Sequence, residues 1–90
     1  MPPKITHVAI RFQGVVYSLP APNRHHHVIY DTAAKTGAKF IDSHGDDQGF
    51  LDETGEYLTR QQAYIRAHET GQIKPNLPYD LNELYSEDIW

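Results

Sequence analysis

The strongest constraint on the fold is an alternating stretch near the N-terminus, residues 5–12 (ITHVAIRF). Apolar side chains fall at every second position from Val8 to Phe12, which is typical of a strand buried on one face. The pair Gln13-Gly14 then turns the chain, and the sequence VVYSL supplies a second arm. The two prolines that follow, Pro20 and Pro22, cannot donate to a ladder and end this arm. Residues 5–20 therefore predict an antiparallel hairpin.

Two stretches have residues typical of helix starts and ends. The first runs from Asn23, a preferred N-cap residue, to Thr36, and Gly37 follows as a left-handed cap. The second opens at Thr59, which forms a capping box with the glutamine three residues later, and stops at Gly71.

The segment between these helices predicts further extended structure. Residues 38–41 (AKFI) are interpreted as a short strand, and residues 42–49 as a polar loop. Residues 49–58, with Gly55 at a tight turn, predict a second hairpin. The predicted fold class is α+β: a small antiparallel sheet of two hairpins packed with two α-helices and an acidic C-terminal tail.

Length and composition limit the organisation of the chain. Ninety residues fit one domain, residues 1–90, and bury a small core, so oligomerisation is expected. The absence of cysteine and of any long apolar run favours a cytoplasmic protein that does not bind membranes. The net charge of −4 forms no basic stripe, so duplex nucleic acid is not an expected partner. The acidic tail, residues 78–90, carries large apolar side chains and should dock on its own domain or on a neighbouring subunit.

The most informative motif is the run Arg24, His25, His26 and His27 at the start of the first predicted helix. Helix starts carry unpaired N–H groups and a partial positive charge, so they attract anions. Cationic residues are unfavourable there unless something negative binds. Arg24 could clamp a phosphate, with His25 or His26 as a neighbouring donor or acceptor. The alternative is that these histidines are ordinary surface and core residues, one of them facing inward.

Three further residues complete the candidate ligand-binding set. Arg60 follows the Thr59 cap and repeats the pattern of a cation at a helix start, and Arg66 lies six residues further on. Phe50 follows a glycine that allows a ligand or a backbone to come close, and an exposed ring there could stack on a base. The alternatives are that Arg60 pairs with Glu56 and that Phe50 belongs to the core.

Catalysis and metal binding are less favoured. Consecutive helical histidines point about 100° apart, so three in a row cannot all ligate one ion. The loop from Asp42 to Asp47 holds carboxylates and a histidine, but it lacks the spacing of an EF-hand. No nucleophile is paired with a base, and no known phosphate loop is present. We expect no metal, no cofactor and no enzymatic activity, the alternative being a hydrolase that uses His25 or His26.

Short motifs along nearly the whole chain resemble a group of small phage proteins. They are AIR, VYSLP, Arg24-His25, Gly49-Phe50, Gly55, EYL, Arg60-x-x-Ala63, Ala67, Gly71-Gln72 and LYSED. This group is taken to include the Thoeris anti-defence type 1 sponge proteins. The resemblance implies a homodimer or higher oligomer that sequesters a cyclic ADP-ribose isomer or a cyclic oligonucleotide without hydrolysing it. It also implies that Arg24 contacts the diphosphate, Phe50 stacks on adenine, and Arg60 or Arg66 adds charge.

Two function classes follow from these observations. The first is a phage anti-defence protein of the host cytoplasm that binds a cyclic nucleotide or another phosphate-bearing small molecule. The second is a protein-interaction module, such as an inhibitor of a host protein, that acts through its acidic and aromatic tail. Tyr85 and Trp90 would be the anchors of that tail.

Overall fold

The computed structural model describes residues 2–41, 47–73, 84–85 and 88–90. In chain order its elements are β1 (Ile5–Phe12), β2 (Val15–Pro20), α1 (His25–Thr36), β3 (Gln48–Asp52), β4 (Tyr57–Thr59) and α2 (Arg60–Thr70). The sheet is antiparallel throughout, with the strand order β2-β1-β3-β4. Two hairpins therefore lie side by side, and the α+β prediction is confirmed.

The β1–β2 hairpin closes in the predicted way. Phe12 pairs with Val15, so the connecting loop has two residues. Both loop residues have positive φ, 53° at Gln13 and 77° at Gly14, which is the type I′ geometry that matches the twist of the flanking strands. The predicted alternation also holds, because Val8 and Ile10 are fully buried and Phe12 is nearly so.

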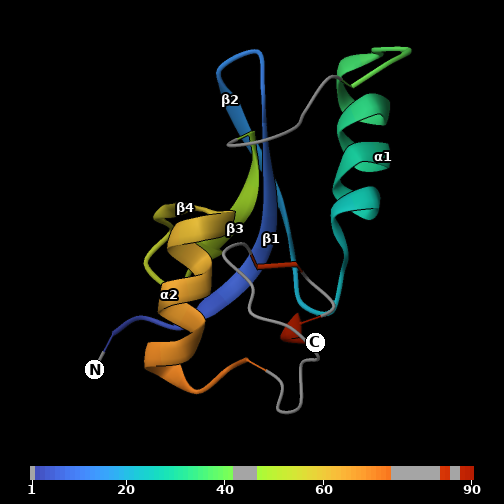
Figure 1. Cartoon of the computed structure of the whole chain (residues 1–90). Coiled ribbons are helices and arrows are strands. Elements are labelled where there is room, and N and C mark those ends of the chain that lie inside the picture. Colours follow the sequence, from blue (N-terminus) through green and yellow to red (C-terminus); the bar gives the residue numbers. More distant parts are fainter. Residues whose placement is uncertain (1, 42–46, 74–83, 86–87) are drawn as a thin grey trace.

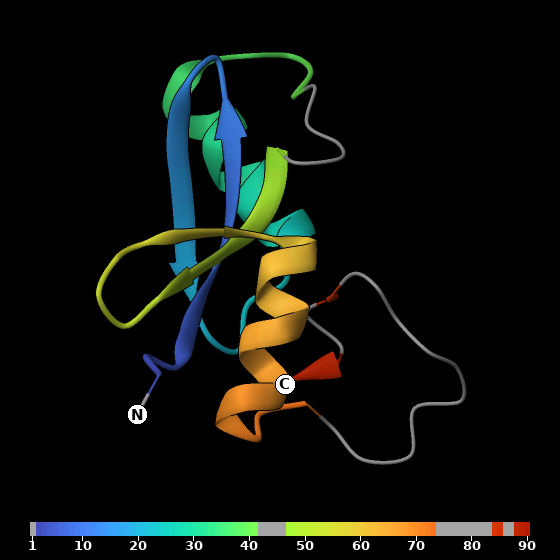
Figure 2. The same cartoon turned by 60° about the vertical axis from the view of Figure 1, so that its left-hand side comes forward.

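The β3–β4 hairpin brings two backbones unusually close. A Cβ atom placed on Gly49 would lie 2.1 Å from the carbonyl oxygen of Leu58 and 2.8 Å from the ring of Tyr57. Only glycine fits at this position, and its missing side chain lets the backbone of β4 come close. Figure 2 shows the resulting shape, in which β4 runs across the direction of β1 in a strongly twisted sheet.

Both helices cover the same face of the sheet. Gln48, Phe50 and Asp52 alternate onto one face of β3. Phe50 meets the ring of His25 from α1, while the other two contact arginines of α2. In Figure 1, α1 runs beside β1 and β2, and α2 lies at the β3–β4 side. The side chains between these two layers form one core: Ile5, Val8, Ile10, Phe12, Val28, Ile41, Phe50, Leu58, Ala63, Ala67 and Leu84.

The helix ends follow the sequence with one shift. Gly37 and Gly71 are left-handed caps, and the Thr59–Gln62 capping box is present, as predicted. The N-cap of α1, however, is Arg24 rather than Asn23. The Nδ2 group of Asn23 instead donates to the Pro20 carbonyl at 2.7 Å, so this side chain closes the preceding turn and is not available as a cap.

The predicted strand at 38–41 is wrong. These residues belong to no strand, and both sides of β1 are already taken by β2 and β3. Ile41 is buried in the core and Ala38 packs against it, while Phe40 is 77% exposed.

The described C-terminal residues pack on their own domain. Leu84 is fully buried, and its N–H donates to the Arg60 carbonyl at 3.0 Å. The Nε1–H of Trp90 donates to the Asn23 carbonyl at 2.8 Å. The Trp90 ring is nearly perpendicular to the Phe50 ring, with the two centroids 6.3 Å apart. Figure 1 shows these residues, in red, beside the start of α1.

Candidate functional site: the start of helix α1

The three histidines at the start of α1 have different environments. His25 is 9% exposed, and its Nε2 donates to the Gly49 carbonyl at 2.8 Å. His26 and His27 are exposed, with ring centroids 4.0 Å apart. His25 is therefore the histidine that faces inward, and it joins α1 to β3. The surface at this helix start is formed by the other two.

His27 takes the place of a conventional cap. Its Nδ1 accepts the N–H of Arg24 at 2.9 Å, three residues back along the chain. This contact satisfies one of the unpaired donors that every helix start leaves, in the way a glutamine does in a capping box. Nδ1 must be unprotonated to accept, so the proton of the neutral ring lies on Nε2. The His27 ring thus has a fixed orientation and presents a donor outward.

Arg24 carries the clearest unused binding capacity at this helix start. Its Nη1 is buried and has no hydrogen-bond partner among the described residues. The first turn of α1 contains no acidic residue to balance the charge. A buried donor without a partner costs free energy, and a charged one costs more. The positive end of the helix dipole adds to that cost. An anion bound at this helix start would offset the positive charge of both the arginine and the helix dipole.

Arg60 stands at the first position of α2, as predicted, but it does not pair with Glu56 within the described contacts. Its Nη2 donates to Gln48 Oε1, and its guanidinium lies 4.6 Å from the centre of the Tyr85 ring. Its Nε is buried, and no residue within the described ranges forms a hydrogen bond with it. Arg60 therefore connects α2, β3 and the C-terminal residues. Its guanidinium is engaged in contacts within the domain.

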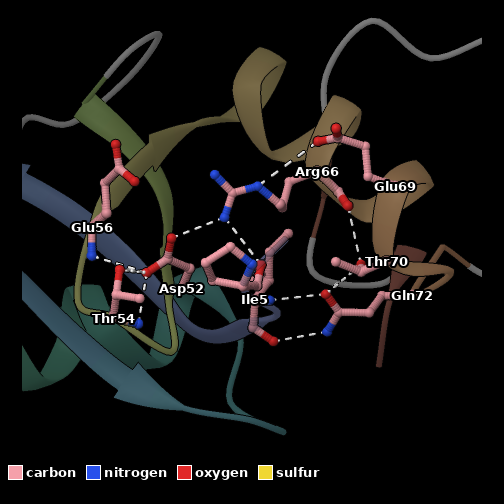
Figure 3. A network of polar contacts seen from close by, with 9 residues as sticks. Ile5, Asp52, Thr54, Glu56, Arg66, Glu69, Thr70 and Gln72 are labelled. Carbon is pink, nitrogen blue, oxygen red and sulfur yellow. Dashed lines mark hydrogen bonds and ion pairs between the residues drawn. The ribbon is translucent and has the colours of Figure 1, made fainter. Parts of the chain in front are cut away.

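Arg66 is committed to a buried carboxylate. Its Nη1 donates to Asp52 Oδ2 at 2.9 Å and to the Pro3 carbonyl at 3.0 Å (Figure 3). The Asp52 side chain is fully buried, and the Arg66 side chain is 17% exposed. The structure therefore places Arg66 in a structural ion pair, away from the start of α1.

Asp52 is held ionised by its neighbours. Burial alone would raise its pKa, but hydrogen bonds from Thr54 and Arg66, together with two backbone N–H groups, lower the pKa to about 2. In Figure 3 the same network continues to Gln72, whose side-chain amide bonds both the N–H and the carbonyl of Ile5. The network fastens the N-terminal strand to the end of α2.

Phe50 is in the core, which was the alternative interpretation. It is fully buried between the ring of His25, at a centroid distance of 5.1 Å, and that of Trp90. A ring in this position cannot stack on a ligand without opening the core. Of the six predicted ligand-binding residues, His26 is exposed and Arg24 is partly buried, both at the start of α1. His25 and Phe50 contact each other in the interior, and Arg60 and Arg66 serve other contacts.

Sequence reasoning missed two exposed aromatic residues near α1. Tyr30 is 70% exposed, and its ring lies 6.2 Å from that of His26, one turn back along the helix. Phe40 is 77% exposed. The available signal was the spacing of four between His26 and Tyr30, which places both side chains on one helix face.

The described residues offer neither a metal site nor a membrane-spanning helix. Within these ranges no three His, Asp or Glu side chains gather in a way that could hold a metal ion. Of the acidic loop considered above, residues 42–46 lie outside the described ranges. None of the helices in the described part of the chain has the length and apolar character needed to cross a membrane.

Comparison with known protein families gives a match. Residues 4–90 match the family model described as phage T4 y16D protein. No curated protein and no solved structure matches the chain. The match supports the expectation of a small phage protein and does not connect the chain with the Thoeris sponges. Because it covers nearly the whole length, the chain belongs to the phage T4 y16D protein family.

Proposed function

We propose that this phage protein is a non-enzymatic binder that sequesters a phosphate-bearing nucleotide at the start of α1, in the host cytoplasm. The ligand class that we favour is a cyclic ADP-ribose isomer or a cyclic oligonucleotide. The observation that carries the proposal is the Nη1 of Arg24, which is buried at the positive end of a helix and has no hydrogen-bond partner in the described part of the chain.

The surroundings of Arg24 supply further ligand contacts. His26 and His27 are exposed beside it, and the fixed His27 ring presents Nε2–H to a phosphate or a ribose oxygen. Because Phe50 is buried, the stacking role passes to Tyr30, whose ring is largely exposed and lies one turn from His26. Arg24, His26, His27 and Tyr30 together form what we call the α1 surface.

The affinity that sequestration requires favours a shared site. A binder that suppresses a signal needs a Kd of about 1 nM, which corresponds to about −12 kcal/mol. One arginine and one stacked ring cannot supply that free energy on an open surface. We therefore place the nucleotide between the α1 surfaces of two copies, in a homodimer or higher oligomer, where more of the ligand is buried.

Thermal melting against a panel of nucleotides tests the proposal. The panel contains ADP-ribose, its cyclic isomers, cyclic dinucleotides and cyclic trinucleotides, with ATP as a control. A ligand that binds only the folded state raises the melting temperature by mass action, so a tight binder in large excess adds several kcal/mol. We expect a selective shift for one cyclic species.

Arg24→Ala should abolish that shift while the protein stays folded. Lys39→Ala is the matched control, because it also removes one exposed positive charge, beyond the other end of α1. The control variant should retain the full shift. A shift that survives in Arg24→Ala would place the nucleotide elsewhere.

A second candidate is a protein-interaction module, and a specific observation favours it. Tyr30 and Phe40 are 70% and 77% exposed, which is unusual for aromatic side chains of a small soluble domain. The C-terminal tail is a less suitable site for binding a partner protein, since Leu84 and Trp90 make contacts within the domain. A panel without any thermal shift would favour this candidate and point to these two aromatic residues.

A further inference from the structure

Among the described residues, no strand pairs with the outer edge of β2. β2 is the terminal strand of the sheet, next to β1 on the side away from β3 (Figure 2). It has six residues, and two of its side chains, Val15 and Val16, are 50% and 40% exposed. Proteins protect such edges with charges, bulges or very short strands. β2 has none of these, and its one proline is the last residue.

The other edge of the sheet is protected. β4 has three residues, and α2 begins directly after it at Arg60. A strand this short offers little for another strand to pair with. Of the two edges of the sheet, β2 is therefore the one that another strand can pair with.

The register fixes which backbone groups of β2 point outward. Phe12 and Val15 close a two-residue hairpin loop, so they form a hydrogen-bonded pair. Hydrogen-bonded and non-hydrogen-bonded pairs alternate along an antiparallel ladder. Val16, opposite Arg11, and Ser18, opposite Ala9, therefore direct their N–H and C=O groups away from β1.

In the described part of the chain, these outward groups form no other backbone hydrogen bond. Neither Val16 nor Ser18 takes part in a backbone hydrogen bond outside the sheet there. Towards the end of the strand the situation differs, because the Pro20 carbonyl accepts two hydrogen bonds from Asn23. The available edge is thus centred on Tyr17, with one donor and one acceptor on each side.

We infer that two copies of this chain pair antiparallel through β2, with Tyr17 on the two-fold axis. Val16 of one copy then faces Ser18 of the other, and each pair exchanges two hydrogen bonds, which extends the sheet across the dimer. A second copy suits this edge because it offers the same spacing of donors and acceptors in the reverse direction.

Charge also favours a second copy at this position. Residues 12–23 contain no charged side chain, although the whole chain has a net charge of −4. Two copies repel each other on average, and an uncharged edge is where they can meet with the least repulsion. Figure 1 shows β2 leading into α1, so the same dimer relates the two α1 helices by its symmetry axis.

Sedimentation equilibrium of the full-length protein tests the inference. The wild type should be a dimer, and Val16→Lys and Ser18→Pro should be monomers. Ser18→Pro removes an outward N–H without removing a hydrogen bond between β1 and β2. Ile65→Lys is the matched control, since Ile65 is 61% exposed on α2, and this variant should remain dimeric. Circular dichroism establishes that each variant is folded.

Amide exchange of the wild type gives a second readout that needs no substitution. The N–H groups of Val16 and Ser18 should exchange more slowly as protein concentration rises, whereas exchange in α2 should not change. A monomeric wild type, or a dimer that survives both edge variants, would overturn the inference. Slower exchange at these amides only when a different protein is added would assign the edge to that partner instead.

Discussion

At the scale of single residues, Asp52 shows how a buried charge is made tolerable. Its carboxylate accepts hydrogen bonds from the Thr54 backbone and hydroxyl, from the Glu56 backbone and from Arg66. Removing a carboxylate from water is costly, and a cost of that kind is recovered only when such donors surround it. The direction of the pKa shift shows that the donors outweigh the burial.

The first prediction concerns stability in acid. The pKa of Asp52 falls from 3.8 to about 2 on folding, so the folded state favours the ionised form. That contribution is fully present above the unfolded pKa and is lost as pH falls from about 4 towards 2. Asp52→Asn should lower the free energy of unfolding at neutral pH by about 2–3 kcal/mol and flatten this acid limb. Urea melts across that pH range measure both effects.

Asp47→Asn is the control for this prediction. Asp47 faces Arg11 at 3.6 Å, and its side chain is 50% exposed. A surface pair of this kind contributes about 0–1 kcal/mol. An equal loss of stability in the two variants would mean that the hydrogen bonds to Asp52 stabilise the fold no more than a surface ion pair does.

The site residues show where single-sequence reasoning reaches its limit. The sequence places cations at two helix starts, and both are there. It does not reveal that Arg66 meets Asp52, because that contact depends on how α2 lies across β3. It also does not decide the orientation of Phe50, since either face of β3 could have carried the helices. Local spacing determines which residues share a face, and tertiary packing determines which face is covered.

At the scale of elements, the predictions that succeeded rest on local rules. Strand alternation, the two-residue turn and the glycine caps are set by neighbours in the chain. The strand predicted at 38–41 failed because strand pairing is not local, and both sides of β1 are taken by β2 and β3. Asn23 failed as a cap because a nearer acceptor, the Pro20 carbonyl, competed for its side chain.

The second prediction is that Gly49→Ala destabilises the β3–β4 hairpin. The added methyl group would meet the Leu58 carbonyl at 2.1 Å, so β4 would have to move away from β3. Overpacking against a backbone should cost at least about 1–3 kcal/mol, measured as a shift of the urea midpoint. The double variant Gly49→Ala with Tyr57→Ala separates the two obstacles, since it removes the ring but leaves the carbonyl. Full recovery of stability in the double variant would identify the Tyr57 ring as the true obstacle.

At the scale of the whole molecule, the C-terminal residues complete the core. Leu84 is fully buried in the cluster that both helices cover, and Trp90 reaches back to the residue before the α1 cap. A domain of this size has little apolar surface to spare, so each such contact is a large share of its stability. Residues distant in sequence thereby support the segment that positions Arg24.

The third prediction separates a structural C-terminus from a partner-binding one. Leu84→Ala should lower the free energy of unfolding by about 2–5 kcal/mol, because it leaves a cavity in the core. Trp90→Phe should cost about 1 kcal/mol, since it keeps an aromatic ring but leaves the Asn23 carbonyl without this donor. Ile65→Ala is the control, because this α2 side chain is 61% exposed and should change stability least. If Leu84→Ala and Trp90→Phe both melted like the wild type, the C-terminal residues would contribute nothing to the fold, and the tail would again be free to bind a partner.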